Sequence, residues 1–192
     1  MSGDLADADG AVEPGRIVLV CGPPGAGKST LARRLAEGFE RSAHLKVDDL
    51  REIMVNGFEP PSTEWTPGNE QQFVRARAAA TLIARLHAAD GVTVVIDDVC
   101  VPAHFEDHYV DLFAEPLVYR VMLKPRWAAL EGRIRSRQGP WDELLLSSGA
   151  AAWCYEGLER LTLENWLVVD SSGQSADETA EDVRKSLARS SF

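Results

Sequence analysis

The chain has 192 residues, the size of one domain built around a single hydrophobic core. Hydrophobic residues make up 45% and charged residues 26%, which is typical of a soluble globular protein and excludes a disordered or fibrous chain. The net charge of −10 argues against a broad basic surface for nucleic acid, but it leaves room for a locally basic site.

Residues 1–14 are acidic and small and show no hydrophobic periodicity. Such a composition buries too little apolar surface to fold, so we predict a disordered acidic tail. The remaining residues, 15–192, contain regularly spaced apolar segments and no internal repeat. We therefore expect them to form one folded domain.

The strongest motif is Gly22–Ser29, which fits the pattern G-x-x-x-x-G-K-[ST] without a mismatch. The apolar run Ile17–Cys21 predicts a buried strand before it, and Lys28–Glu40 predicts an amphipathic helix after it. Glycines let successive backbone N–H groups point at a phosphate, and the helix N-terminus adds its positive dipole end. A chance glycine loop is the alternative, but it would lack this flanking strand and helix. We predict a nucleotide-binding loop formed by Gly22, Pro23, Pro24, Gly25, Ala26, Gly27, Lys28, Ser29 and Thr30.

Two side chains of this loop have predicted chemical roles. Lys28 would reach the β- and γ-phosphates and act in catalysis, and the Ser29 hydroxyl would bind Mg²⁺. The loop itself does not distinguish ATP from GTP as the nucleotide.

The next strand is predicted at His44–Val47, and a brief helix follows at 50–55. Asp48 would then lie where an acceptor hydroxyl approaches the γ-phosphate, and its carboxylate could accept the hydroxyl proton as a general base. Asp49 is expected to cap the helix. Arg51 would hold a polar or anionic group of the acceptor, with a solvated helix arginine as the alternative.

Residues 57–68 are rich in proline and glycine and carry aromatic side chains, a composition typical of a mobile lid or binding loop. Asn69 is expected to cap the helix that follows, whose apolar residues keep helical spacing over 73–86. We predict that Trp65 and Arg75 contact the acceptor. Ordinary packing is the alternative for the aromatic side chain.

Val92–Ile96 is a β-branched run that ends in Asp97 and Asp98. An apolar strand that ends in an aspartate is the pattern of an acid that binds Mg²⁺ beside a phosphate loop, so Asp97 is the second predicted metal ligand. The alternative for Asp97 is a helix cap or an ordinary loop carboxylate.

The rest of the chain continues to alternate strands with helices. The predicted elements are a helix from Pro102 that ends before Glu115, a strand at Leu117–Leu123, a helix after Pro125, a helix at 150–163, a strand at Trp166–Val169 and a last helix capped by Ser175 and Glu178. This alternation predicts an α/β fold with a parallel sheet covered by helices on both faces.

The segment 120–137 reverses the charge of an otherwise acidic chain, with six basic residues and one glutamate. Arg133 and Arg137 are four residues apart and share one face of the predicted helix. This spacing suits one guanidinium stacked on the nucleotide base and one placed on the transferring phosphate. We predict that Arg133 binds the nucleotide and that Arg137 is catalytic, with a solvated basic helix face as the alternative.

The cysteines and the absence of targeting patterns in the sequence indicate the cellular compartment that we expect. The three cysteines, Cys21, Cys100 and Cys154, show no metal-ligand spacing and suit reduced thiols. No run reaches the roughly 18 apolar residues of a membrane span, and no signal-peptide pattern is present. We expect a cytoplasmic protein with no membrane partner.

Together these residues resemble the small P-loop phosphotransferases, which include the kinase domain of polynucleotide 5′-kinases, chloramphenicol phosphotransferase, zeta toxins and gluconate-kinase-like enzymes. Asp48 and Arg51 match the D-x-x-R element of polynucleotide kinases, whose aspartate is the general base and whose arginine contacts the acceptor. Arg133 and Arg137 match the base-stacking and lid arginines. The segment 170–175 resembles the nucleotide-base loop, which implies that Ser172 and Gly173 bind the nucleotide.

The resemblance covers most of residues 16–189 and implies a P-loop NTPase fold with a five-stranded sheet of order 2-3-1-4-5 and an arginine-bearing lid between strands four and five. Residues 15–192 would then be a P-loop kinase domain that uses ATP or GTP with Mg²⁺.

We expect a phosphotransferase that moves the γ-phosphoryl group to a hydroxyl, with a small molecule favoured as acceptor. If the acceptor is instead a nucleic-acid 5′ end, the protein would be a polynucleotide 5′-hydroxyl kinase. A nucleotide-binding switch or NTPase without an acceptor is the alternative from another functional class. The Asp48–Arg51 pair disfavours a switch, because a switch has no use for a base that faces away from the nucleotide. The oligomeric state stays open, with a dimer among the alternatives.

Overall fold

The computed structural model describes residues 13–60, 62–99 and 106–189. The tail predicted over residues 1–14 lies almost entirely outside these ranges, as does the predicted start of a helix at Pro102.

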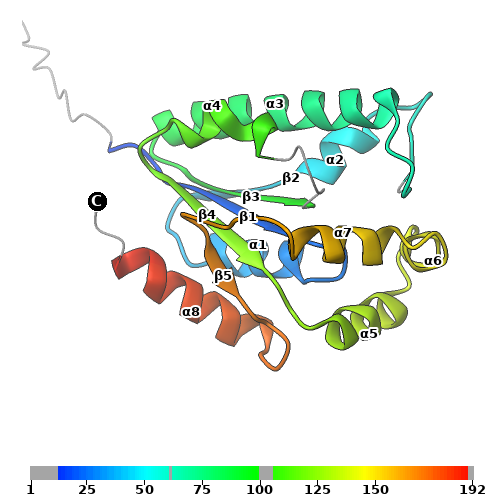
Figure 1. The fold of residues 1–192 in the computed structure, drawn as a ribbon. Coiled ribbons are helices and arrows are strands. Elements are labelled where there is room, and N and C mark those ends of the chain that lie inside the picture. The colour runs from blue at the N-terminus through cyan, green and yellow to red at the C-terminus, as the bar shows by residue number, and fades with distance from the viewer. Residues whose placement is uncertain (1–12, 61, 100–105, 190–192) are drawn as a thin grey trace, which may run out of the picture.

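Five parallel strands form one sheet in the order β2-β3-β1-β4-β5, which confirms the predicted topology (Figure 1). The strands are β1 at Ile17–Gly22, β2 at Ser42–Lys46, β3 at Thr93–Val99, β4 at Val118–Leu123 and β5 at Leu167–Val169. Because β1 is central and all strands run the same way, the residues that follow β1, β2 and β3 meet at one edge of the sheet.

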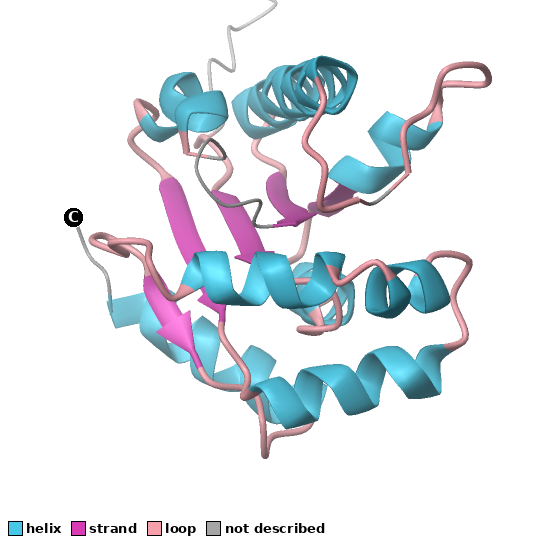
Figure 2. Cartoon of the chain, turned by 45° about the vertical axis from the view of Figure 1, so that its right-hand side comes forward, coloured by secondary structure: helices cyan, strands magenta, loops and turns pink. Residues whose placement is uncertain are grey.

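Helices cover both faces of this sheet, as the sequence predicts. They are α1 (Lys28–Ala36), α2 (Val47–Glu52), α3 (Pro67–Ala89), η1 (a 3-10 turn, Asp107–Tyr109), α4 (Val110–Phe113), α5 (Trp127–Arg137), α6 (Asp142–Ser147), α7 (Ala150–Leu158) and α8 (Ala176–Arg189). Helices α3 and α4 lie over one face and α1 and α8 over the other, while α2, α5, α6 and α7 stand near the edge toward which the strands point (Figures 1 and 2). In the part of the chain that is described, none of the helices combines the length and hydropathy needed to cross a bilayer.

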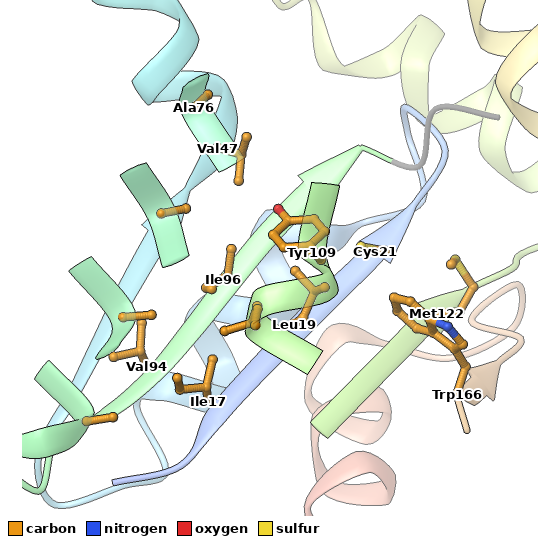
Figure 3. Packing of buried hydrophobic residues seen from close by; sticks show 14 of the residues in the cluster. Ile17, Leu19, Cys21, Val47, Ala76, Val94, Ile96, Tyr109, Met122 and Trp166 are labelled. Atoms are coloured by element: carbon orange, nitrogen blue, oxygen red, sulfur yellow. The ribbon is translucent and has the colours of Figure 1, made fainter. Parts of the chain in front are cut away.

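Strand β1 is buried along its whole length, because its side chains alternate between two cores. Ile17, Leu19 and Cys21 join the core under α3, in which Tyr109 lies over β1 and β3 (Figure 3). On the other face, Val18 packs with residues of α1 and α8. This burial on both faces fixes the position of the loop that follows β1.

The start of α3 differs from the prediction. Thr66 caps the helix, and Asn69 lies three residues inside it. The Asn69 N–H donates to Thr66 Oγ1 at 3.0 Å, and the Thr66 N–H donates to Asn69 Oδ1 at 3.3 Å. This is a capping box in which asparagine replaces the usual glutamate or glutamine, so the predicted cap was wrong by one turn.

The start of α2 and the end of β3 also differ from the prediction, which changes where the acidic residues lie in these elements. Helix α2 begins at Val47 directly after β2, and Lys46 at its N-cap makes no side-chain cap. Asp48 and Asp49 therefore both lie in the first helical turn, where a negative charge favours the helix dipole, and Asp49 does not cap the helix. Strand β3 extends to Val99, so Asp97 and Asp98 are inside the strand rather than after it.

Candidate active site

The loop between β1 and α1 has the backbone that its glycines require. Gly25 and Gly27 have φ of 82° and 97°, in the left-handed region that glycine tolerates best. A Cβ on Gly25 would lie 2.5 Å from Cγ1 of Ile134 on α5, so this helix packs directly against the loop. A Cβ on Gly22 would lie 2.7 Å from the backbone oxygen of Leu123 in β4. The loop thus has backbone turns that favour glycine, and it packs closely against α5 and β4.

Lys28 and Ser29 begin α1 immediately after this loop. The Lys28 side chain is 9% exposed, and its Nζ donates to the backbone oxygen of Pro23 at 3.1 Å. Ser29 Oγ donates to Asp97 Oδ1 at 3.2 Å, which brings the two predicted metal ligands together from α1 and β3.

This pair of oxygens fits Mg²⁺. The ion usually binds one or two protein oxygens and completes its shell with waters and phosphate oxygens, so Ser29 and Asp97 suffice beside a nucleotide. No larger group of His, Cys, Asp and Glu side chains that could hold a metal occurs within the described ranges.

His44 positions Asp97, and sequence reasoning missed it. Its Nε2 lies 2.5 Å from Asp97 Oδ2, and both side chains are largely buried, with exposures of 10% and 5%. His44 pairs with Val95 across β2 and β3, and Lys46 pairs with Asp97, so His44 and Asp97 are diagonal neighbours on one face of the sheet. Strand register, once known, would have pointed to this contact.

Two clefts meet at the phosphate loop. The first, which we call the donor cleft, encloses about 960 Å³ including open solvent and is bounded by the loop, α5 and the start of α8. The second, which we call the acceptor cleft, encloses about 940 Å³ including open solvent and is bounded by the loop, α2, residues 58–60 and 62–65, α3, α6 and α7. Both clefts are lined by Gly25, Lys28, Ser29 and Arg137.

Arg133 lies in the wall of the donor cleft. Its Nη1 donates to the backbone oxygen of Ala26 at 3.2 Å, and its Nη2 donates to the backbone oxygen of Ser171 at 2.6 Å. In the neighbouring loop, Ser171 and Gln174 line this cleft, whereas Ser172 and Gly173, which the sequence analysis expects to bind the nucleotide, are not among its lining residues. Ser172 Oγ instead accepts from the backbone N–H of Arg126 at 2.7 Å.

Arg137 lies at the end of α5, where the two clefts join. Its Nε donates to Asp142 Oδ2 at 3.0 Å, and this hydrogen bond raises the pKa of Arg137 and lowers that of Asp142. Asp142 also accepts the Gly139 N–H at 2.6 Å. Helix α6, which the sequence analysis did not predict, thus holds the Arg137 side chain in place.

Asp48 lines the acceptor cleft, and 54% of its side chain is accessible there. The surrounding walls nevertheless desolvate the carboxylate and raise its pKa above the usual value for aspartate. Lys28 opposes this rise, and Asp98 reinforces it. A carboxylate with a raised pKa is a stronger proton acceptor than an ordinary aspartate, so long as it stays ionised.

The Arg51 side chain is buried within the wall of the acceptor cleft. It is 6% exposed, and its guanidinium carbon lies 3.8 Å from the ring centroid of Phe73 and 5.4 Å from that of Phe58. Its Nη1 is 3.4 Å from Asp48 Oδ1, and its Nη2 donates to the backbone oxygen of Glu59 at 3.2 Å. Arg51 therefore ties α2 to the loop and to α3.

The two other predicted acceptor residues have different outcomes. Trp65 lines the acceptor cleft, and its Nε1 donates to Glu70 Oε2 at 2.6 Å. Arg75 is exposed on α3, donates to Gln71 Oε1 at 3.2 Å and does not line the cleft. Aromatic side chains that were not predicted, among them Trp141 and Trp153, complete the cleft wall.

Comparison with known proteins agrees with this architecture. A search of curated proteins finds no significant match. Among solved structures, a sugar kinase from Janibacter sp. HTCC2649 superposes with a TM-score of 0.65 at 22% identity and covers 92% of this chain and 96% of that one. A gluconokinase from Sinorhizobium meliloti 1021 gives 0.60 at 21% over 92% and 93%. The APS kinase of Mycobacterium tuberculosis gives 0.59 at 19% over 92% and 99%.

At these identities the likeness establishes the fold alone. The sequence profile of the family described as "AAA domain" matches residues 17–145, a range that contains the glycine loop, Asp97, Arg133 and Arg137. Because this match covers more than half of the chain, the protein belongs to the AAA domain family and has its P-loop kinase-like fold.

Proposed function

We propose that the protein is an NTP-dependent phosphotransferase that moves the γ-phosphoryl group of ATP or GTP to the hydroxyl of a small molecule. The observation that carries this proposal is the meeting of two separate clefts at Lys28, Ser29 and Arg137. A switch or a simple NTPase needs only the donor cleft. A second, walled cleft on the far side of the same lysine suits a second substrate.

In this mechanism the nucleotide phosphates lie on the backbone of the loop, with Lys28 on the β- and γ-phosphates. Ser29 and Asp97 would hold Mg²⁺, which supplies charge neutralisation between the phosphate oxygens. Arg137 lies at the junction of the clefts, where it can stabilise charge that develops on the transferring group.

Asp48 would act on the other substrate. The acceptor hydroxyl oxygen forms a bond to the γ-phosphorus, the bond from that phosphorus to the β–γ bridging oxygen breaks, and the nucleoside diphosphate leaves. The hydroxyl proton passes to the Asp48 carboxylate. Lys28 and Asp48 line the same cleft, and the positive charge of Lys28 acts on the Asp48 carboxylate. Both observations support this assignment.

The test is transfer from γ-labelled ATP or GTP to a panel of small alcohols and, separately, to a 5′-hydroxyl oligonucleotide. Formation of a small-molecule phosphate ester that depends on Lys28 supports the proposal. Preferential labelling of the oligonucleotide, with a steep loss at higher salt, would instead identify a polynucleotide kinase. Release of inorganic phosphate with no ester product would identify an NTPase.

The pH dependence should report the raised pKa of Asp48. A base works only when ionised, so kcat/KM falls as the pH drops through the pKa of the carboxylate. Because that pKa is raised by desolvation, the acid limb is expected at higher pH than for an ordinary aspartate. A pH–rate profile of kcat/KM measures it. An acid limb at or below the usual aspartate range would remove Asp48 as the base.

His44→Gln is expected to weaken Mg²⁺ use without unfolding the protein. The substitution loses the 2.5 Å contact that orients Asp97, and such supporting contacts typically change metal affinity by about 10- to 100-fold. A titration of activity against Mg²⁺ should shift to higher concentration by a comparable factor, with maximal activity largely recovered in excess metal. An unchanged Mg²⁺ titration would contradict the role given to His44.

A further inference from the structure

Two groups of stacked aromatic rings wall the acceptor cleft. Trp65 stacks on Phe73 with ring centroids 5.1 Å apart and on Trp153 at 6.4 Å, with interplanar angles of 26° and 29°. Phe58 and Trp141 form a second pair at 5.6 Å, with their planes tilted by 34°. All five side chains line the cleft. Such walls favour a flat, apolar ring system over a chain of hydroxyl groups, because aromatic faces pack best against other rings.

The charges of the cleft do not favour an anionic acceptor. Of the basic side chains that line it, Lys28 serves the phosphate loop and Arg137 is paired with Asp142. Arg51 is engaged by Asp48, by a backbone oxygen and by two phenyl rings. The same described wall carries three carboxylates, Asp48, Glu52 and Asp97. The three basic side chains are matched by three carboxylates, so the described lining offers no excess of positive charge to a carboxylate or phosphate on the acceptor.

We infer that the acceptor is an uncharged, hydroxyl-bearing compound with a flat aromatic body. This inference rests on the proposed phosphotransferase function and names the substrate class of its acceptor cleft. The rings of Trp65 and Trp153 contact the flat body, and the hydroxyl faces Asp48. The class differs from a sugar acid or a nucleotide, both of which carry negative charge.

Three matched probes separate aromaticity from charge. The first is 4-(hydroxymethyl)benzamide, which is neutral and aromatic; the second is 4-(hydroxymethyl)benzoate, its anionic counterpart; the third is 4-(hydroxymethyl)cyclohexanecarboxamide, its saturated counterpart. Their dissociation constants are measured by saturation-transfer NMR on the full chain with a non-hydrolysable ATP analogue. We expect the benzamide to bind about tenfold more tightly than each of the other two.

Two tryptophan variants locate the site. Trp153→Leu removes part of the aromatic wall and should bring the benzamide down to the affinity of the cyclohexane compound. Trp127→Leu is the matched control, because Trp127 packs on Tyr155 at 5.5 Å and does not line the acceptor cleft. The dissociation constant of Trp127→Leu for the benzamide should match that of the unsubstituted protein. Thermal unfolding and binding of the ATP analogue establish that both variants are folded.

The possible failures are distinct. The aromatic class is overturned if the benzoate or the cyclohexane compound binds as tightly as the benzamide or more tightly, or if no probe binds. If the protein still binds the ATP analogue in these cases, the phosphotransferase proposal stands. Benzamide binding that survives in Trp153→Leu also overturns the aromatic class. Failure of the unsubstituted protein to bind the ATP analogue at all would instead overturn the proposed function.

Discussion

Replacing Asp48 with asparagine is expected to lower kcat by about 10²- to 10⁴-fold while the dissociation constant of the nucleotide stays the same. Asparagine keeps the size of the side chain and can still accept from Arg51 Nη1, which lies 3.4 Å from Asp48 Oδ1. It cannot take up the proton that the acceptor hydroxyl loses. Single-turnover transfer and equilibrium nucleotide binding, measured on the same preparation, separate the two effects.

Asp49→Asn provides the matched control. Asp49 is the next residue of α2, its side chain is 68% exposed, and its Oδ2 lies 3.9 Å from Lys46 Nζ. It lines neither cleft, so both kcat and nucleotide affinity should stay within about twofold of the unsubstituted protein. If Asp48→Asn retained transfer at the level of this control, the assigned base would be wrong. A fall in nucleotide affinity with unchanged kcat would mean that Asp48 belongs to the donor side.

The parts of the site that were predictable depend on neighbours in the sequence. The phosphate loop, with Lys28 and Ser29, is a continuous motif whose glycine backbone is fixed by the strand and helix on either side. Asp97 was predictable because an apolar strand leads into it. The sheet order was implied by resemblance and is confirmed, since the motif and the strand spacing belong to one fold.

The parts that were missed depend on contacts between distant segments. His44 and Asp97 are 53 residues apart, and their contact requires the register between β2 and β3. Helix α6 has only six residues, too few to show a helical period, although its Asp142 holds Arg137. The helix cap is an exception, because Pro67 at the first position of α3 is a local signal for a cap at Thr66 that the prediction of Asn69 did not use.

Arg75 and Arg77 show a signal that was present but not used. Residues two apart on a helix point to nearly opposite sides, since each residue turns the helix by about 100°. Arg77 lies four residues after Phe73 and three before Ala80, both of which are buried, so it belongs to the inward face. Arg75 lies two residues from both Phe73 and Arg77, on the opposite side of the helix, and is exposed. Hydrophobic periodicity alone could therefore have placed Arg77 inside and Arg75 outside.

Arg77 is the centre of a buried network between α3, β3 and η1. It is fully buried, and its Nε donates to Asp98 Oδ2 at 2.6 Å while its Nη2 donates to the Val99 oxygen at 3.0 Å. Its Nη1 lies 2.8 Å from His108 Nδ1, and the Tyr109 hydroxyl donates to Asp98 Oδ2 at 3.0 Å. Burial alone would lower the pKa of Arg77, but the Asp98 carboxylate outweighs it and the pKa is raised.

Arg77→Met is therefore expected to reduce the free energy of unfolding by about 3–5 kcal/mol, the usual cost of removing one partner from a buried ion pair. Methionine fills much of the space of the arginine stem, so the loss comes from the Asp98 charge left without its partner rather than from a cavity. The Tyr109 hydroxyl still donates to Asp98 Oδ2 but carries no positive charge to balance it. Urea unfolding, followed by circular dichroism, measures the change.

A second substitution tests that cause. In Arg77→Met/Asp98→Asn the stranded charge is gone, so part of the lost stability should return, and the double variant should be more stable than the sum of the two single changes predicts. Arg75→Met is the matched control on the exposed side of the same helix and should change stability by no more than about 0.5 kcal/mol. If Arg77→Met resembled this control, the network would contribute little. If the two single effects simply added, the buried charge would not be the reason for the loss, because two groups that act on each other must show a coupling energy.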